Sequence, residues 1–223
     1  MRRVQVFDVN ETLLDLAAMD PHFERVFGDA AVRRDWFNQM IQSALVATVT
    51  GAYSQFGALA MAALEMTAEQ AGVEVREEDR DAIAGQMRRL PAHPEVPGAL
   101  QRLRDAGLRL AALTNSTEQV ARAQLEHAGL IEAFELVLSA DTVRRLKPAP
   151  EPYRMAAERL GVAVGEVRLV AAHAWDVAGA VRAGCAAAFV ARPGKVLDPL
   201  VERPDVVGAD LVAVADGILA ADK

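Results

Sequence analysis

The sequence predicts an α/β protein with a doubly wound, mostly parallel, Rossmann-like core and an inserted helical cap domain. Three observations lead to this prediction. Residues 3–7 carry the valines and the phenylalanine of a buried strand. Apolar residues then recur at helical spacing through most of residues 15–90. From residue 99 onward, helix and strand patterns alternate, which is typical of a parallel sheet with helices on both faces.

The helical segment that follows the first strand is predicted to be the cap. Its apolar residues are spaced for helices from Trp36 to Leu45 and from Leu59 to Leu64. Only Val73–Val75 has any character of a strand there. Three prolines and a glycine within residues 90–98 break the helical pattern and indicate a linker between cap and core.

The core is predicted to comprise residues 1–14 and 95–223, and the cap residues 15–94. Gly107 and Gly129 end two of the core helices, and Pro150 starts a third. The predicted core helices are 99–107, 117–129, 150–161 and 175–184, the later strands are 108–114, 134–139, 167–172 and 186–191, and residues 209–220 close the chain.

Composition excludes several classes of function. The 223 residues carry a net charge of −7, so no nucleic-acid partner is expected. No apolar run reaches the length of a membrane span, and the start of the chain does not resemble a signal peptide. We therefore expect no membrane partner and a cytoplasmic location. The single cysteine excludes an internal disulfide, and the Ala- and Arg-rich composition is compatible with a bacterial source.

Polar side chains gather at or near the ends of the predicted strands. Ligands of an open parallel sheet bind at the carboxyl ends of its strands, so we expect these side chains to lie close together. The four groups are Asp8 with Thr12; Thr114, Asn115 and Ser116; Lys147; and His173 with Asp176.

Each group taken alone also has a purely structural explanation. Asp8, Asn115 and Asp176 are residue types that cap helices or form turns, and lysines such as Lys147 are usually solvated. His173 fits an ordinary loop. Four such groups in strand-end order favour a functional site.

The residue types in these groups suit nucleophilic catalysis. A carboxylate such as Asp8 can attack a substrate and form a covalent ester. Lys147 would supply the cation that keeps Asp8 ionised, and Asp176 would hold Lys147 and help to position water. Thr12 and Asn115 would orient the substrate and stabilise departing negative charge.

Four motifs carry a resemblance to a known family over essentially the whole chain. FDVNETLLD, LTNS, KPAPEPY and AAHAWD resemble, in this order, the four motifs of the haloacid dehalogenase (HAD) superfamily. The HAWD segment and the spacing from Lys147 to Tyr153 resemble, more narrowly, the type II (L-)2-haloacid dehalogenases. The resemblance implies a HAD-like fold, a hydrolase with a small-molecule substrate, no metal or other cofactor, and a homodimer.

The resemblance also implies a mechanism. Asp8 attacks C2 of a short 2-haloalkanoic acid and displaces halide with inversion, and water then hydrolyses the aspartyl ester. The implied catalytic residues are Asp8, Thr12, Lys147 and Asp176. The implied substrate-binding residues are Asn10, Phe37, Phe56, Thr114, Asn115, Tyr153, His173 and Trp175. His173 replaces an Asn of the family pattern and can donate a hydrogen bond or act as a base near neutral pH.

Two departures from the family pattern limit the function. Phosphatases of the superfamily carry a second Asp where this chain has Asn10, which cannot act as a general acid. The type II dehalogenases carry an Arg where this chain has Phe37, and a Phe cannot bind an anion as a guanidinium does. Arg33 and Arg34 are the candidates to replace it, although both are also explained as surface arginines.

The leading hypothesis is a metal-independent hydrolase of the 2-haloacid dehalogenase type. A related hypothesis keeps Asp8 as the nucleophile but changes the substrate to another small acid with an electrophilic carbon or a strained ring. A phosphatase is disfavoured by Asn10. A binding or regulatory protein is disfavoured because the whole set of strand-end groups is present.

Overall fold

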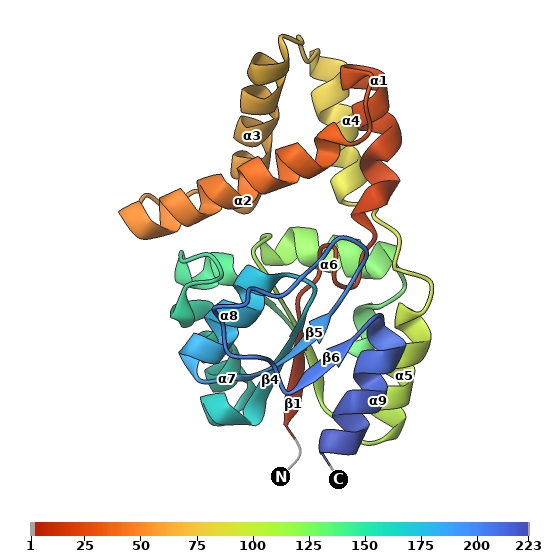
Figure 1. Ribbon diagram of the computed structural model, residues 1–223, viewed down its shortest axis with the longest axis vertical. Coiled ribbons are helices and arrows are strands. Elements are labelled where there is room, and N and C mark those ends of the chain that lie inside the picture. The colour runs from red at the N-terminus through yellow and green to blue at the C-terminus, as the bar shows by residue number, and fades with distance from the viewer. Residues whose placement is uncertain (1–2, 223) are drawn as a thin grey trace.

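A computed structural model of the chain describes residues 3–222 and, over these residues, shows a six-stranded sheet in the order β3-β2-β1-β4-β5-β6 (Figure 1). Every pair of neighbouring strands is parallel. The strands are β1 (Val4–Phe7), β2 (Leu110–Thr114), β3 (Leu136–Ser139), β4 (Val167–Ala171), β5 (Ala186–Val190) and β6 (Val206–Gly208). The predicted α/β, doubly wound fold class is thus confirmed.

The helices alternate with the later strands, as the sequence predicts. The α-helices are α1 (Asp20–Phe27), α2 (Val32–Thr50), α3 (Phe56–Ala71), α4 (Glu77–Met87), α5 (Val96–Asp105), α6 (Glu118–His127), α7 (Pro150–Leu160), α8 (Ala174–Ala183) and α9 (Leu211–Ala221). Within residues 3–222, none of these helices combines the length and the apolar character needed to cross a bilayer.

Helices cover both faces of the sheet because successive side chains of a buried strand point to opposite sides. Val4 and Val6 pack with apolar residues of α7 and α8. Phe7 packs on the other face, with apolar residues of α5, α6 and α9. In Figure 1, α7 and α8 accordingly lie on one side of the strands and α5 and α9 on the other.

Helices α1–α4 lie together beyond the carboxyl end of β1, on the side of the sheet opposite the two chain ends (Figure 1). Trp36 of α2 anchors this group, because its indole is fully buried and donates a hydrogen bond to the carbonyl oxygen of Ala60 in α3. The division into a cap (residues 15–94) and a core (residues 1–14 and 95–223) stays a prediction.

Three local predictions differ from the structure. Val73–Val75 is not a strand: α3 ends at Ala71, the φ of 66° at the following Gly72 stops the helix, and Val75 is buried as part of a loop. The linker is shorter than predicted, because Val96 and Pro97 already belong to α5, where proline is tolerated in the first turn. Strand β6 was not predicted, since three residues are too few to show an alternating pattern.

The strand order creates a switch point between β1 and β4. From β1 the chain continues outward through β2 and β3 on one side and through β4, β5 and β6 on the other. Loops that leave the carboxyl ends of β1 and β4 therefore diverge and leave a crevice, which is where open α/β sheets bind ligands. Asp8 directly follows β1, and His173 follows β4 by two residues.

Helix α8 packs against the loop before α7 without room for a side chain at Gly179. A Cβ there would lie 2.5 Å from Cβ of Pro148 and 2.7 Å from the hydroxyl oxygen of Tyr153. We expect Gly179→Ala to lower the free energy of unfolding by about 1–3 kcal/mol through overpacking. Urea denaturation measures this loss. Gly85→Ala, in α4 with nothing within 4 Å of the added Cβ, is the matched control and should not destabilise; equal effects at both positions would contradict the argument.

Candidate active site

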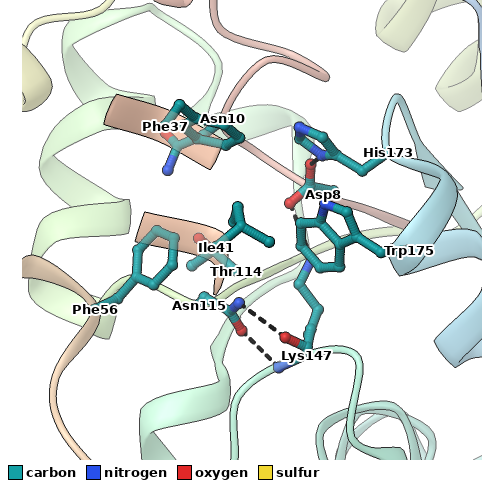
Figure 2. A pocket seen from close by; sticks show the side chains of 10 residues that line it. All are labelled: Asp8, Asn10, Phe37, Ile41, Phe56, Thr114, Asn115, Lys147, His173 and Trp175. Atoms are coloured by element: carbon teal, nitrogen blue, oxygen red, sulfur yellow. Dashed lines mark hydrogen bonds and ion pairs between the residues drawn. The ribbon is translucent and has the colours of Figure 1, made fainter. Parts of the chain in front are cut away.

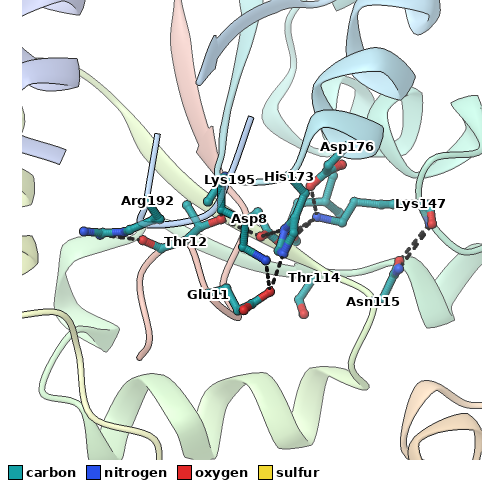
Figure 3. Close-up of polar contacts among 12 residues, drawn as sticks. Asp8, Glu11, Thr12, Thr114, Asn115, Lys147, His173, Asp176, Arg192 and Lys195 are labelled. Carbon is teal, nitrogen blue, oxygen red and sulfur yellow. Dashed lines mark hydrogen bonds and ion pairs between the residues drawn. The ribbon is translucent and has the colours of Figure 1, made fainter. Parts of the chain in front are cut away.

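Asp8 lies buried at the carboxyl end of β1, at the centre of the strand-end groups (Figure 3). Its backbone NH donates to the carbonyl oxygen of Val170 (3.0 Å), so the register between β1 and β4 holds it. Lys147 Nζ lies 2.9 Å from Asp8 Oδ1, and Thr12 Oγ1 lies 2.6 Å from Asp8 Oδ2. His173 Nδ1 lies 3.2 Å from the same Oδ2.

These contacts keep the Asp8 carboxyl ionised. Burial alone would raise its pKa, but the Lys147 ammonium, the His173 ring and the Thr12 hydroxyl together hold the pKa of Asp8 well below its usual range. Ionised carboxylates are the form that attacks an electrophile. The site therefore presents a nucleophile at any pH near neutrality.

Lys147 is fully buried and is placed between two carboxylates. Its Nζ donates to Asp8, to Asp176 Oδ2 (2.6 Å) and to the carbonyl oxygen of Leu113 (3.0 Å). Burial works against its charge, but Asp176 and Asp8 outweigh it and raise the pKa of Lys147. One ammonium is shared by two carboxylates, so the group of three carries excess negative charge. Burial and the nearby Asp8 carboxylate therefore raise the pKa of Asp176.

Tyr153, in α7, supports Asp176 rather than contacting Lys147 directly. Its hydroxyl donates to Asp176 Oδ1 and lies 3.2 Å from the carbonyl oxygen of the same residue. Burial and the Asp176 carboxylate raise the pKa of Tyr153 well above its usual value, so the phenol keeps its proton. Tyr153 thus fixes the carboxylate that holds the lysine.

Asn115 fixes the main chain of Lys147. Asn115 Oδ1 accepts from the Lys147 backbone NH (2.7 Å), and Asn115 Nδ2 donates to the Lys147 carbonyl oxygen (3.2 Å). Thr114 Oγ1 accepts from the backbone NH of Ser116 (3.1 Å), which shapes the turn after β2. These hydrogen bonds therefore hold together the loops that carry Asn115 and Lys147, which are distant in sequence.

The Thr12 side chain binds Asp8 and does not face the space above it where a substrate would bind. Its hydroxyl donates to Asp8 and accepts from the backbone NH of Ala172 (3.0 Å), so the hydroxyl ties the loop after β1 to the end of β4. We expected Thr12 to hold the substrate as well. The structure differs, because the hydroxyl is already engaged on both sides and Thr12 does not line the cavity over Asp8.

A cavity of about 10 Å³, close to the space that one water molecule needs, lies over Asp8 beneath the helices of residues 20–87 (Figure 2). Apolar and aromatic groups make up much of its wall, and amide, hydroxyl and charged groups the rest. The lining residues are Asp8, Asn10, Phe37, Ile41, Phe56, Thr114, Asn115, Lys147, His173 and Trp175. Asn10 Oδ1 accepts a hydrogen bond from Gln124 Nε2 (3.1 Å), which orients its amide.

Phe56 also lines a larger cavity, of about 630 Å³, that extends along α3, α4 and the start of α6. The Phe56 side chain is therefore part of the wall between the cavity over Asp8 and this larger space.

Neither candidate arginine reaches the cavity. Arg33 is mostly buried but its side chain pairs with Asp20 and lies 3.9 Å from Glu11. Arg34 is exposed. Neither lines the cavity over Asp8, so the position opposite the nucleophile is occupied by the Phe37 ring without a guanidinium beside it.

Sequence reasoning missed Glu11, Lys195 and Ile41. Glu11 Oε2 lies 2.8 Å from His173 Nε2 and 2.6 Å from Lys195 Nζ. Lys195 lies shortly after β5, so the strand-end criterion that selected the other groups would have selected it too. Ile41 is one helical turn from Phe37 on α2, and that spacing places both on one face.

The donor set of the site does not suit a metal ion. Among residues 3–222, no three His, Cys, Asp or Glu side chains are grouped so that they could hold one. Asp8 and Asp176 are each engaged by Lys147, whose ammonium takes the place between them where a cation would sit. The site can thus deliver an ionised carboxylate to a small, partly apolar cavity.

Comparisons with known proteins agree with this geometry. A family model described as haloacid dehalogenase-like hydrolase matches residues 3–184. (S)-2-haloacid dehalogenase 1 of Pseudomonas sp. (strain CBS-3) is 32% identical over 80% of this chain and 79% of its own. Haloacetate dehalogenase H-2 of Moraxella sp. (strain B) is 28% identical over 98% of both chains. The L-2-haloacid dehalogenase of Xanthobacter autotrophicus, solved with chloropropionic acid covalently bound, superposes with a TM-score of 0.89 at 26% identity, covering 97% of this chain and 98% of that one.

Proposed function

Because the chain belongs to the haloacid dehalogenase-like hydrolases, we propose that it hydrolyses the carbon–halogen bond of short (S)-2-haloalkanoic acids through an ester on Asp8. The observation that carries the proposal is the ionised, buried Asp8 facing a small cavity with aromatic walls. An anionic oxygen stripped of most of its water is a strong nucleophile toward saturated carbon.

Each neighbour of Asp8 has a part in this reaction. Asp8 attacks C2 of the substrate, the C–O bond forms on the face opposite the leaving halide, and the halide leaves with the bonding electron pair. Lys147 and Thr12 hold the carboxylate in one orientation for this attack. Asn115 and Thr114 line the cavity and offer polar groups to the substrate carboxylate. Water then cleaves the ester at the Asp8 carbonyl carbon.

Phosphoryl transfer fits the site less well than attack at carbon. A phosphatase needs an acid that protonates the leaving alcohol, and Asn10 stands where the superfamily has that Asp. An amide has no proton to give at this pH. Phosphate release from p-nitrophenyl phosphate with Mg²⁺ is therefore expected to stay at the level of the protein-free reaction.

Phe37 favours a second candidate substrate class. Without a guanidinium in this position, the site lacks the cation that the type II pattern offers to halide and substrate. A small acid with another electrophilic carbon, such as an epoxide acid, needs no halide pocket and would still be opened by Asp8. Screening such acids beside 2-haloacids decides between the two classes.

The proposal is tested with L-2-chloropropionate in metal-free buffer. We expect chloride and lactate in equal amounts, inverted at C2, and the D-isomer should react far more slowly. Asp8→Asn is the inactive control. No chloride above that control at high enzyme concentration, with no acid of the second class consumed either, would refute attack by Asp8 at carbon.

The resemblance also implies a homodimer, whereas the residue patterns predict a cytoplasmic location and a cap of residues 15–94, and we include all three in the proposal. Sedimentation equilibrium of the purified chain tests the dimer. A single species at the mass of one chain, across the micromolar range, would contradict it.

A further inference from the structure

We propose that His173 is the base that activates water for hydrolysis of the Asp8 ester, and that Glu11 is its positioning residue. This inference rests on the proposed function, because it concerns the second step of that reaction. It is carried by a continuous chain of contacts from Asp8 through His173 and Glu11 to Lys195 (Figure 3).

The His173 ring is fixed in one orientation by four neighbours. Nδ1 faces Asp8 Oδ2 at 3.2 Å, and Nε2 faces Glu11 Oε2 at 2.8 Å. The ring is stacked between Phe37 and Trp175, with centroid distances of 5.6 and 5.1 Å. Nδ1 therefore stays within one water molecule of the Asp8 carboxyl carbon, which is the geometric requirement for a base in this step.

Glu11 occupies a conformation that its residue type rarely adopts. Its φ is 61°, in the left-handed region that costs a residue with a Cβ on the order of 1 kcal/mol. Its carboxylate is nevertheless held on two sides, by the His173 ring and by Lys195, and Lys195 also lies over the Phe37 ring at 5.5 Å. Backbone strain at a residue whose side chain binds two charged partners beside the nucleophile indicates a function for that side chain.

In the free enzyme the surroundings of His173 favour the protonated ring, which cannot accept a proton. Burial disfavours its charge, but hydrogen bonds to the Asp8 and Glu11 carboxylates raise the pKa of His173 above its usual value. His173 and Lys195 in turn overcome burial and lower the pKa of Glu11 to about 2. Both ring nitrogens then donate, one to each carboxylate.

Formation of the ester changes this balance. Asp8 loses its negative charge, so Nδ1 loses the anion that favours its proton, and the ring pKa falls toward its ordinary value near 6.5. The charged and titratable groups around the ring are then Glu11, Lys147, Asp176, Lys195, Arg33 and the substrate carboxylate, with His93 near the Glu11 carbonyl oxygen. The ring becomes a base only at the stage that needs one.

The protons balance through one turnover. After halide leaves, Nδ1–H gives its proton to solvent, and this is the proton that the overall hydrolysis releases. Nδ1 then takes a proton from water as the water oxygen bonds to the Asp8 carbonyl carbon. Collapse of the tetrahedral intermediate breaks the bond to the hydroxyacid oxygen, which takes that proton. The remaining carboxyl proton of Asp8 passes to Nδ1, which restores the free enzyme.

Single-turnover measurements test the proposal with L-2-chloropropionate and enzyme in excess. His173→Gln should still release up to one equivalent of chloride and should accumulate the Asp8 ester, seen as a mass increase of one 1-carboxyethyl group on the Asp8 peptide. Its ester hydrolysis should be about 10²- to 10⁴-fold slower than that of the unaltered protein. His127→Gln, at an exposed position of α6, is the matched control and should hydrolyse the ester normally.

Glu11 is tested by the pH dependence of ester hydrolysis. Removing its charge in Glu11→Gln should shift the acid limb of this step to lower pH by roughly 1 unit or more, because the carboxylate favours the protonated ring. Glu11→Gly, which suits the left-handed backbone at this position, should shift it in the same direction. A merely structural Glu11 would slow both steps and leave the pH profile in place.

The outcomes separate this inference from the proposed function. Ester hydrolysis at the normal rate in His173→Gln, or equal losses in chloride release and ester hydrolysis, would overturn the role of His173. Failure of the unaltered protein to release chloride or to form any ester would instead overturn the proposed function. Hydrolysis in ¹⁸O-labelled water should place the label in Asp8 after one turnover, which shows that water attacks the carboxyl carbon.

Discussion

We expect Asp8→Asn to abolish halide release, with a loss on the order of 10⁵-fold or more, since removal of a covalent nucleophile costs that much in other hydrolases. An uncharged amide at position 8 cannot displace halide from saturated carbon. The measurement is chloride release from L-2-chloropropionate at saturating substrate. The protein concentration is high enough for the chloride assay to detect the residual rate.

The variant should fold, because the amide keeps the shape of the carboxylate. Lys147 still has Asp176, and the Thr12 hydroxyl can still donate to the amide oxygen. Far-UV circular dichroism and the urea midpoint check this point. Asp35→Asn, an exposed carboxylate of α2, is the matched control and should keep full activity.

The location of the ester provides a second, independent measurement. Rapid acid quench of the unaltered protein should leave the 1-carboxyethyl group on the peptide that contains Asp8, and the variant should carry none. Chloride release within tenfold of normal in Asp8→Asn, or an ester on a different carboxylate, would contradict the assignment of the nucleophile.

Much of the fold could be predicted because the core elements repeat a simple pattern. Helices α6, α7 and α8 have glycine or proline at their ends, and β2, β4 and β5 are short apolar runs between them. The elements that escaped prediction lack such signals. Strand β6 has three residues and gains its stability from pairing with β5, for example Phe189 with Val207, which is not visible in local sequence.

From the residues alone the candidate site could be predicted where side chains follow strand ends, and the family resemblance added Phe37 and Phe56, which line the cavity. Asp8, Asn115 and Lys147 follow that rule. In the structure the Lys147 ammonium donates to Asp8, and the Lys147 backbone NH donates to the Asn115 side chain. The role of Thr12 could not be predicted, because its partner, the backbone NH of Ala172, is set by strand register. Glu11 escaped because only three-dimensional contacts with His173 and Lys195 show its importance.

Loss of the lysine should have the largest effect on stability. Lys147→Met keeps the volume of the side chain but leaves Asp8 and Asp176 without their shared cation in the interior. Removing one partner of a buried ion pair typically costs about 3–5 kcal/mol, because the remaining charge has no compensation. We expect a loss of this size in the free energy of unfolding at pH 7, measured by urea denaturation. Arg104→Met, at an exposed position of α5, is the control and should be within about 0.5 kcal/mol of the original.

The pH dependence of this loss follows from the direction of the pKa shifts. In the unaltered protein the pKa of Asp8 is lowered, mainly by Lys147 against the effect of burial, so its stabilising contribution is present at neutral pH and is lost as the pH falls below 3.8. Without Lys147, burial dominates and raises the pKa of both carboxyls in the folded state. A raised pKa contributes stability at low pH that is lost as the pH rises, so Lys147→Met should recover part of its deficit between pH 7 and pH 5. The unaltered protein should gain less, because there only Asp176 and His173 have raised pKa values while that of Asp8 is lowered. A deficit that stays constant over this range would contradict a buried, uncompensated pair of carboxylates.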